Sequence, residues 1–196
     1  IGCRTGRGTF ELARFYEHVT GIDATARLIR IATQMKEEEF IRYVRKDEGE
    51  IMSYVEAKLE DHDLCELKDK VEFWQADISN LNPKFSGYDL VIVEAMLSRT
   101  TVPARFLKMI HERLNPGGYL LIADSWDWSE ERTSRENWLG GFRKDGEPFG
   151  SQEALAAILS ERFELIPPVL ELPRTEAQSS RTFRIDLLEG SLWRLR

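Results

Sequence analysis

Two aspartates and a glycine-rich turn are the residues of this chain whose types and spacing could do chemistry. Residues 1–8 read Ile-Gly-Cys-Arg-Thr-Gly-Arg-Gly and open a helical pattern, after which a short apolar run ends in Asp23. Glycine lets a backbone turn tightly and approach a ligand, and a carboxylate at a strand tip accepts hydrogen bonds from both hydroxyls of a ribose. The stretch therefore predicts a βαβ unit that binds a nucleoside. The alternative is a glycine-rich turn without a ligand, because such patterns are weak alone.

The spacing of the glycines narrows the choice of nucleoside. From Gly2 the turn reads G-x-R-x-G-x-G, whereas the dinucleotide signature G-x-G-x-x-G places a glycine at the helix start to meet a pyrophosphate. The turn resembles the (D/E)-x-G-x-G-x-G motif of class I S-adenosylmethionine-dependent methyltransferases, with Arg4 where the middle glycine usually lies. The acidic residue of that motif would precede Ile1, so we expect the chain to begin inside its first strand. The resemblance implies S-adenosylmethionine as cofactor, bound by Gly2, Cys3, Arg4, Gly6, Asp23 and Ala24.

Asp77 ends a second apolar run, 71–77, and Ile78 follows it. In the methyltransferases that the chain resembles, an acid here receives the adenine amino group and the next backbone amide meets a ring nitrogen. A carboxylate that accepts from the amine, with a donor to the ring, reads neutral adenine by shape. The alternative for Asp77 is a helix N-cap. Asp23 and Asp77 end successive predicted parallel strands, whose carboxyl ends bind ligands in open α/β sheets.

Glu94 ends the predicted strand 87–94, at the edge where the reactive sulfonium of the cofactor would lie. A carboxylate there could favour the positive centre electrostatically, and the alternative is a surface glutamate. We also expect Glu94 and Arg99 to bind the substrate. Nucleobase amino methyltransferases carry Asn/Asp-Pro-Pro-aromatic at this point, whereas residues 94–97 read Glu-Ala-Met-Leu, which counts against methylation of nucleobase amines.

Three of the five tryptophans fall within the segment 126–138, after the next predicted strand. Exposed loops are normally small and polar, so we interpret this segment as an aromatic lid over the substrate. An aromatic wall could stack on a flat or cationic ring, and nearby acids could orient it. The predicted substrate-binding residues of the lid are Asp124, Trp126, Trp128 and Trp138. The alternative is a packed structural loop.

Hydrophobic periodicity supplies the elements that must position these residues. It predicts helices over 24–35, 56–68, 103–114 and 151–159, strands over 119–123 and 163–172, and a last strand within 181–196. Apolar runs on either side of Asp47-Glu48-Gly49 predict an inserted β-hairpin, with a continuous helix as the alternative. Pro167-Pro168 should break the edge strand. The order predicts an α/β fold: a doubly wound, Rossmann-like, mostly parallel sheet with an antiparallel last strand, the inserted β-hairpin and the aromatic-rich lid.

Length and composition restrict the class of protein. A chain of 196 residues with 42% hydrophobic content fits one compact domain, 1–196, truncated at its N-terminus. The net charge of −7 argues against nucleic acid. No apolar run approaches the ~20 residues that a membrane span needs. The distant Cys3 and Cys65 indicate neither a disulfide framework nor a metal site, which fits a reducing cytoplasm.

A narrower resemblance rests on four stretches: 6–14, 19–27, 110–118, and the Trp-Leu-Gly-Gly (138–141) and Asp-Gly-Glu-Pro (145–148) block. They resemble the 4-mercaptohistidine N1-methyltransferase family, the C-terminal domain of ovothiol synthase. The resemblance implies a small-molecule methyl acceptor, the imidazole of a thiolated histidine, and fusion to or cooperation with a sulfoxide synthase. A neutral imidazole nitrogen is nucleophilic near pH 7, so the protein need only align the reactants. We therefore assign no catalytic side chain and expect His18, His62 and His111 to be structural or solvent-facing.

Three functions remain open at this point. The first is an active small-molecule N-methyltransferase. The second is a degenerate cofactor-binding domain, if the bulk of Arg4 closes the turn. The third is a nicotinamide-dependent oxidoreductase, which the glycine spacing disfavours.

Overall fold

A computed structural model describes all residues 1–196, which form two compact units. The N-terminal unit comprises Gly2–Ala76 and Arg174–Ile185, and the C-terminal unit comprises Ile1, Asp77–Pro173 and Asp186–Arg196. Each unit has its own sheets and its own core, so each is described separately.

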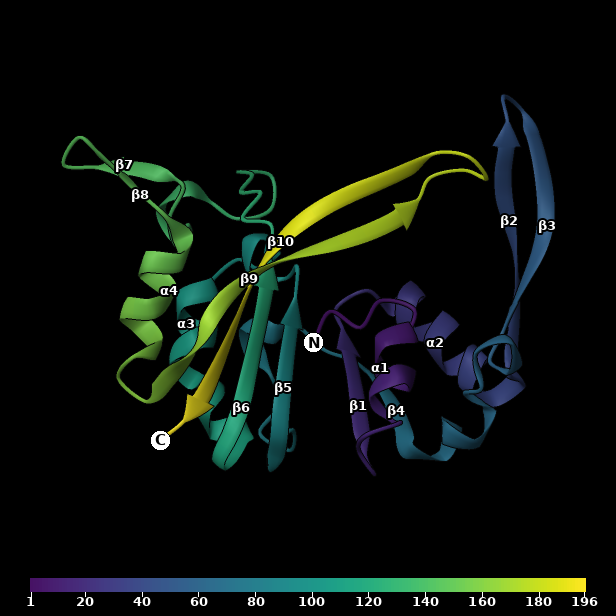
Figure 1. The fold of residues 1–196 in the computed structure, drawn as a ribbon, viewed down its shortest axis with the longest axis horizontal. Helices are drawn as coiled ribbons and strands as arrows, with labels where there is room; N and C mark the ends of the chain where they lie inside the picture. Colours follow the sequence, from purple (N-terminus) through teal and green to yellow (C-terminus); the bar gives the residue numbers. More distant parts are fainter. The chain divides into compact units, whose positions relative to one another are not determined.

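The N-terminal unit is built on a parallel pair of strands that a helix and a hairpin connect (Figure 1). Its elements are α1 (Arg7–Leu12), β1 (Val19–Asp23), α2 (Ala26–Glu38), β2 (Phe40–Glu48), β3 (Ile51–Lys58) and β4 (Val71–Gln75). β1 and β4 pair in register from Val19 opposite Val71 to Asp23 opposite Gln75. Asp23 lies at the carboxyl end of β1, as predicted, while the parallel partner of β1 is β4 and no strand precedes α1 in residues 1–6.

The inserted hairpin is confirmed, and the continuous helix is excluded. β2 and β3 pair antiparallel around the two-residue turn Gly49-Glu50, where Gly49 has a φ of 54°. The helix predicted over 56–68 is wrong. β3 continues through Lys58 because Arg42 and Ile41 still pair with Glu56 and Ala57, and two 3₁₀ helices (Glu60–His62 and Cys65–Lys70) follow. Cross-strand pairing here overrides a modest helix propensity.

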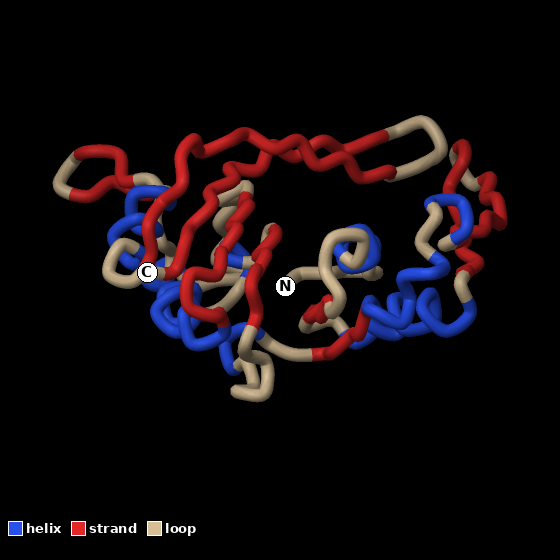
Figure 2. Tube along the Cα trace, turned by 60° about the horizontal axis from the view of Figure 1, so that its bottom comes forward, coloured by secondary structure: helices blue, strands red, loops and turns tan.

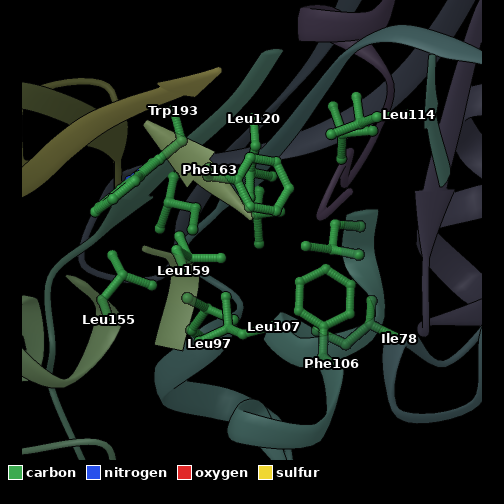
Figure 3. Close-up of a cluster of buried hydrophobic side chains, with 14 of the residues drawn as sticks. Ile78, Leu97, Phe106, Leu107, Leu114, Leu120, Leu155, Leu159, Phe163 and Trp193 are labelled. Atoms are coloured by element: carbon green, nitrogen blue, oxygen red, sulfur yellow. The ribbon is translucent and has the colours of Figure 1, made fainter. Parts of the chain in front are cut away.

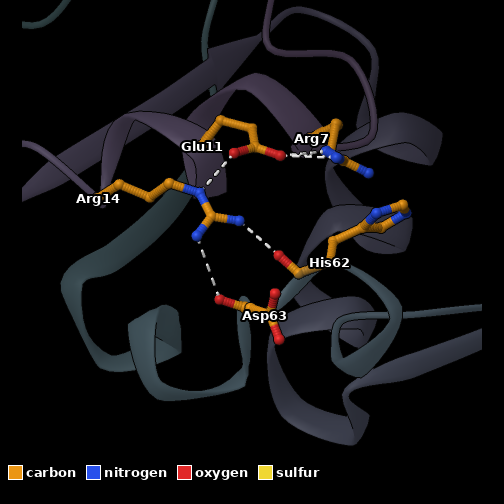
Figure 4. A network of polar contacts seen from close by, with 5 residues as sticks. All are labelled: Arg7, Glu11, Arg14, His62 and Asp63. Atoms are coloured by element: carbon orange, nitrogen blue, oxygen red, sulfur yellow. Dashed lines mark hydrogen bonds and ion pairs between the residues drawn. The ribbon is translucent and has the colours of Figure 1, made fainter.

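A small apolar core and a polar network hold α1 in the N-terminal unit. The core contains Phe10, Ala13, Leu59, Leu64 and Val71. Figure 4 shows the network: Glu11 accepts from Arg7 and Arg14, and the Arg14 guanidinium donates to the carbonyls of His62 and Asp63. The end of α1 is thereby fixed to the 3₁₀ turn that leads towards β4.

The C-terminal unit contains a four-stranded mixed sheet in the order β5-β6-β10-β9. Its elements are β5 (Tyr88–Glu94), α3 (Pro103–Met109), β6 (Leu114–Asp124), β7 (Phe142–Lys144), β8 (Glu147–Phe149), α4 (Ser151–Leu159), β9 (Phe163–Ala177) and β10 (Phe183–Leu195), with β9 and β10 extending beyond the unit. β5 is parallel to β6 and β10 is antiparallel to it, so the predicted reversed last strand is confirmed. Figure 2 shows the helices along one side of this sheet.

Two predicted boundaries in this unit are wrong. β9 runs unbroken through Pro167-Pro168, because it is an edge strand and the missing N–H groups cost no ladder bond there. The helix predicted over 103–114 ends at Met109, a 3₁₀ helix covers Ile110–Arg113, and β6 starts at Leu114.

The core of the C-terminal unit lies between the sheet and the helices α3 and α4. Figure 3 shows side chains from α3, α4, β6, β9 and β10 meeting there, with Trp193, Leu120, Leu155 and Phe163 almost completely buried. The fold is therefore α/β with mixed sheets. The single doubly wound sheet of the prediction is not observed as such, because the strands fall into four separate sheets. None of the helices is long and apolar enough to cross a membrane.

Candidate cofactor and substrate site

Backbone hydrogen bonds fix the glycine-rich turn against the end of β1. The N–H groups of Gly2 and Cys3 both donate to the carbonyl of Ile22, at 2.8 and 3.1 Å. Gly2, Arg4 and Gly6 have φ angles of 79°, 54° and 92°. Glycine adopts these left-handed conformations freely, whereas any other residue pays about 1–2 kcal/mol. The requirement for positive φ explains the two glycines and makes Arg4 a strained position.

Asp23 is held at the end of β1 as an oriented acceptor. Its side chain is only 5% exposed, and its two carboxylate oxygens accept from the backbone N–H groups of Arg4 (3.0 Å) and Thr25 (2.9 Å). An ionised carboxylate offers about four lone-pair positions, so capacity remains for two further donors. Two vicinal hydroxyls, as in a ribose, match that capacity.

The ring of Phe73 packs against two glycines in the N-terminal unit. A Cβ at Gly6 would lie 2.7 Å from Phe73 Cζ, and a Cβ at Gly21 would lie 2.7 Å from both Phe73 Cδ1 and Thr9 Oγ1. Gly21 and Phe73 are direct partners in the β1–β4 ladder. Glycine is therefore required at both positions for close packing. Sequence reasoning missed Phe73, because its importance depends on which residue it pairs with.

The remaining predicted residues of the turn lie beside Asp23. The Arg4 guanidinium forms an exposed ion pair with Glu176 of β9, another contact that the sequence did not reveal. Burial, with a smaller contribution from the charge of Asp23, raises the pKa of the Cys3 thiol to about 11, so Cys3 is a neutral thiol at pH 7. Ala24 is exposed, and its carbonyl accepts from Gln75 at 3.3 Å.

Asp77 has the geometry of an N-cap in the C-terminal unit. Its Oδ1 accepts from the N–H of Ser79 at 2.8 Å, at the start of the 3₁₀ helix Ile78–Asn80. Ile78 is 3% exposed and belongs to the apolar core. Asp77 is thus an N-cap, but the capping bond uses only one oxygen of an exposed carboxylate. Recognition of adenine by Asp77 and Ile78 stays a prediction.

Glu94 and Arg99 lie on either side of the turn that follows β5. Glu94 is half-buried and pairs with Ala123 of β6, and Arg99 is exposed in the 3₁₀ helix Leu97–Arg99. Both therefore stand at the carboxyl end of the parallel pair β5–β6, where α/β sheets bind ligands. Their contact with a substrate stays a prediction.

The structure gives Asp124 a different role from the predicted one. Its side chain is 1% exposed. Oδ2 accepts from the N–H groups of Leu97 and Ser98 at 2.9 and 3.3 Å, and Oδ1 accepts from that of Trp126 at 3.0 Å. Three backbone donors occupy this carboxylate, so it fastens the chain after β5 to the end of β6, and its burial leaves no exposed surface for the predicted substrate contact.

The aromatic segment is a packed loop, and the interpretation as a lid is wrong. Trp126, Trp128 and Trp138 stack in series, with ring centroids 6.3 and 6.1 Å apart and interplanar angles of 22° and 21°. Each indole N–H is fixed: Trp126 donates to Glu189 Oε2, Trp128 to Ser151 Oγ and Trp138 to the carbonyl of Thr133, all at 2.8 Å. Trp126 and Trp128 also pack against the core. Such anchoring produces a rigid wall.

The predicted residues thus form two groups, one in each unit. Gly2, Cys3, Arg4, Gly6, Asp23 and Ala24 gather around the turn, and Glu94, Arg99, Asp124 and the tryptophans gather at the ends of β5 and β6. Binding of a ligand by either group stays a prediction.

Comparisons with known proteins agree on one kind of domain. A family model described as a methyltransferase domain matches residues 1–165, while no curated protein matches the chain. The N-methyltransferase NodS of Bradyrhizobium japonicum, solved with S-adenosyl-L-homocysteine, has a TM-score of 0.57 at 17% identity over 99% of this chain and 74% of its own. A SAM-dependent methyltransferase of Methanosarcina mazei has a TM-score of 0.57 at 21% identity, over 99% and 89%. A magnesium protoporphyrin IX methyltransferase of Synechocystis, solved with SAM, has a TM-score of 0.55 at 14% identity, over 100% and 67%. At these identities the three structures establish a shared fold.

Proposed function

Since the chain belongs to the methyltransferase domain family, we propose that it transfers the methyl group of S-adenosylmethionine to a nitrogen of a small molecule. The observation that carries the proposal is the buried carboxylate of Asp23, which two backbone amides orient beside a turn of left-handed residues. This arrangement suits the ribose hydroxyls and the close backbone approach that an adenosine needs.

S-adenosylmethionine, as cofactor, supplies a methyl group activated by a positively charged sulfur. Asp23 would accept from the ribose, Gly2 and Gly6 would let the backbone approach, and Asp77 and Ile78 would recognise the adenine. Glu94, at the end of β5, would stabilise the sulfonium electrostatically. Arg4 stays compatible with binding because its guanidinium pairs with Glu176 and its N–H, not its side chain, holds Asp23.

The acceptor is the imidazole of a thiolated histidine. The lone pair of a ring nitrogen would form the new N–CH₃ bond as the S–CH₃ bond breaks with its electrons on sulfur, and the other ring nitrogen would release its proton to water. A neutral azole needs no strong base. The resemblance of residues 138–141 and 145–148 to the 4-mercaptohistidine N1-methyltransferases supports this acceptor, as does the aromatic wall in the C-terminal unit. A sulfoxide synthase, fused or separate, would supply the thiolated ring.

Mass spectrometry of the products tests this function. The chain is incubated with S-adenosylmethionine that carries a deuterated methyl group and with 5-thiohistidine, histidine or other small azoles. We expect the labelled methyl on a ring nitrogen of 5-thiohistidine, and loss of that product in Asp23→Ala but not in the exposed control Glu17→Gln. If only another of the tested compounds were labelled, that compound and not 5-thiohistidine would be the substrate. A folded protein that binds the cofactor and labels nothing would favour a degenerate domain.

A further inference from the structure

Trp126 is held in a conformation that a tryptophan rarely adopts. Its φ is 52°, its N–H donates to Asp124 Oδ1 at 3.0 Å, and its indole N–H donates to Glu189 Oε2 at 2.8 Å. A left-handed conformation is strained for a residue with a bulky side chain, and such strain is common at ligand sites. Three independent contacts, including the stack on Trp128, therefore determine the position of this ring.

Glu189 comes from a distant part of the chain and was not predicted as a site residue. In the β6–β10 ladder it lies directly opposite Asp124, at the carboxyl end of β6. The Asp124 carboxylate accepts hydrogen bonds from three backbone amides. Glu189 is half-buried and uses Oε2 for the indole, which leaves Oε1 as an acceptor for another donor. Of the two carboxylates at this rung, Glu189 is the one available to a ligand.

A cation lies against one end of the aromatic stack, and Trp126 is the ring at the other end. The Arg135 guanidinium lies 5.9 Å from the ring centre of Trp138, and no such cation contact is found at Trp126, which is half-buried like the other two rings. The face of an indole attracts cations and stacks with flat rings. A ring placed on Trp126 would thus find a π face and a carboxylate oxygen together.

We propose that Trp126 and Glu189 form the binding wall for the methyl acceptor, a flat azole that carries an N–H donor. The proposal rests on the proposed function and identifies the part of the site that selects the acceptor. Methyl transfer from a sulfonium moves positive charge onto the azole ring. An indole face and a carboxylate both stabilise that charge where it develops, so the wall favours the transition state as well as the bound ring.

Steady-state kinetics with 5-thiohistidine as the varied substrate test the proposal. Glu189→Gln keeps an oxygen for the indole and removes the charge, and Glu130→Gln is the control because Glu130 is an exposed carboxylate near the same segment. We expect Glu189→Gln to lower kcat/KM about tenfold, as for loss of a charged hydrogen bond, while the Kd for S-adenosylhomocysteine and the melting temperature stay unchanged. Wild-type kinetics in Glu189→Gln would overturn the proposal. A parallel loss of cofactor affinity would indicate a structural role and would also overturn it.

Tryptophan fluorescence separates this proposal from the proposed function. The protein loaded with S-adenosylhomocysteine is titrated with 5-thiohistidine and with imidazole. We expect quenching in the wild type that weakens in Glu189→Gln and largely disappears in Trp126→Phe. If quenching depends on Glu189 but no methyl group is transferred, the binding wall is supported and the proposed reaction is rejected. Quenching that neither variant alters would reject the wall even in an active enzyme.

Discussion

Arg4 offers the sharpest test of the backbone geometry at the glycine-rich turn. Its φ of 54° costs a residue with a side chain about 1–2 kcal/mol, which glycine avoids, although glycine loses about 0.5–1 kcal/mol more in chain entropy. Arg4→Ala and Arg4→Gly both lose the ion pair with Glu176. The two side chains of this pair are 45% and 36% exposed, so the pair contributes about 0–1 kcal/mol. The ion pair cancels in the difference between the two variants, which leaves the strain less the chain entropy of glycine, so Arg4→Gly should be more stable by about 1 kcal/mol.

Thermal unfolding followed by circular dichroism measures this difference. For a chain of this size, 1 kcal/mol corresponds to about 2–4 °C in Tm. Arg7 is the matched control, because it starts α1 and also pairs with Glu11. There the order should reverse, since alanine exceeds glycine in a helix by about 1 kcal/mol. If Arg4→Ala melts at or above Arg4→Gly while the Arg7 pair behaves as expected, the left-handed conformation of Arg4 is refuted.

Three further predictions concern packing, a buried carboxylate and a thiol. Gly21→Ala should lower the free energy of unfolding by about 1–3 kcal/mol, because the new Cβ meets Phe73 and Thr9 at 2.7 Å. Gly8→Ala, with open space around the new Cβ, should not lower it. Denaturant titration measures both variants, and equal effects would contradict the close packing at Gly21. Asp124→Asn should cost about 1.5–3 kcal/mol in the same assay by weakening charged bonds to the Leu97 and Ser98 amides, against little change for the exposed Asp127→Asn. Since the pKa of Cys3 is raised from 9.0 to about 11 by burial, the folded state disfavours the thiolate: the stability that the neutral thiol contributes is complete below pH 9.0 and is lost as the pH rises through about 11. Denaturation from pH 8 to 11 should therefore show a decline in stability that Cys3→Ser lacks, and identical pH profiles would contradict the raised pKa of this thiol.

Local sequence patterns were sufficient to predict the elements with strong hydrophobic periodicity or a clear turn sequence. The hairpin followed from apolar runs around Asp47-Glu48-Gly49, and α4 followed from inward-facing Leu155 and Leu159. Errors arose where partners far along the chain decide the conformation. β3 extends through 56–58 because β2 pairs with it, and β9 tolerates two prolines because it lies at an edge.

The same reason explains the outcome at the candidate site. The motif was sufficient to predict that Asp23 stands beside the turn, because βα geometry is local. The importance of Phe73, Glu176 and Glu189 depends on ladder partners and tertiary contacts that no motif encodes. The sequence showed that the tryptophans cluster, but it did not show which residues accept hydrogen bonds from their indole N–H groups. The indole N–H partners Glu189, Ser151 and Thr133 make a rigid wall of what resembled an exposed loop.

Calorimetric titration with S-adenosylhomocysteine tests most directly whether the turn and Asp23 bind the adenosine of the cofactor. We predict saturable binding to the wild type, and binding at least about tenfold weaker in Asp23→Asn, since one charged acceptor for the ribose is lost. Glu17→Gln should bind like the wild type. An absence of binding to the folded wild-type protein, or equal affinity in Asp23→Asn, would contradict the assignment.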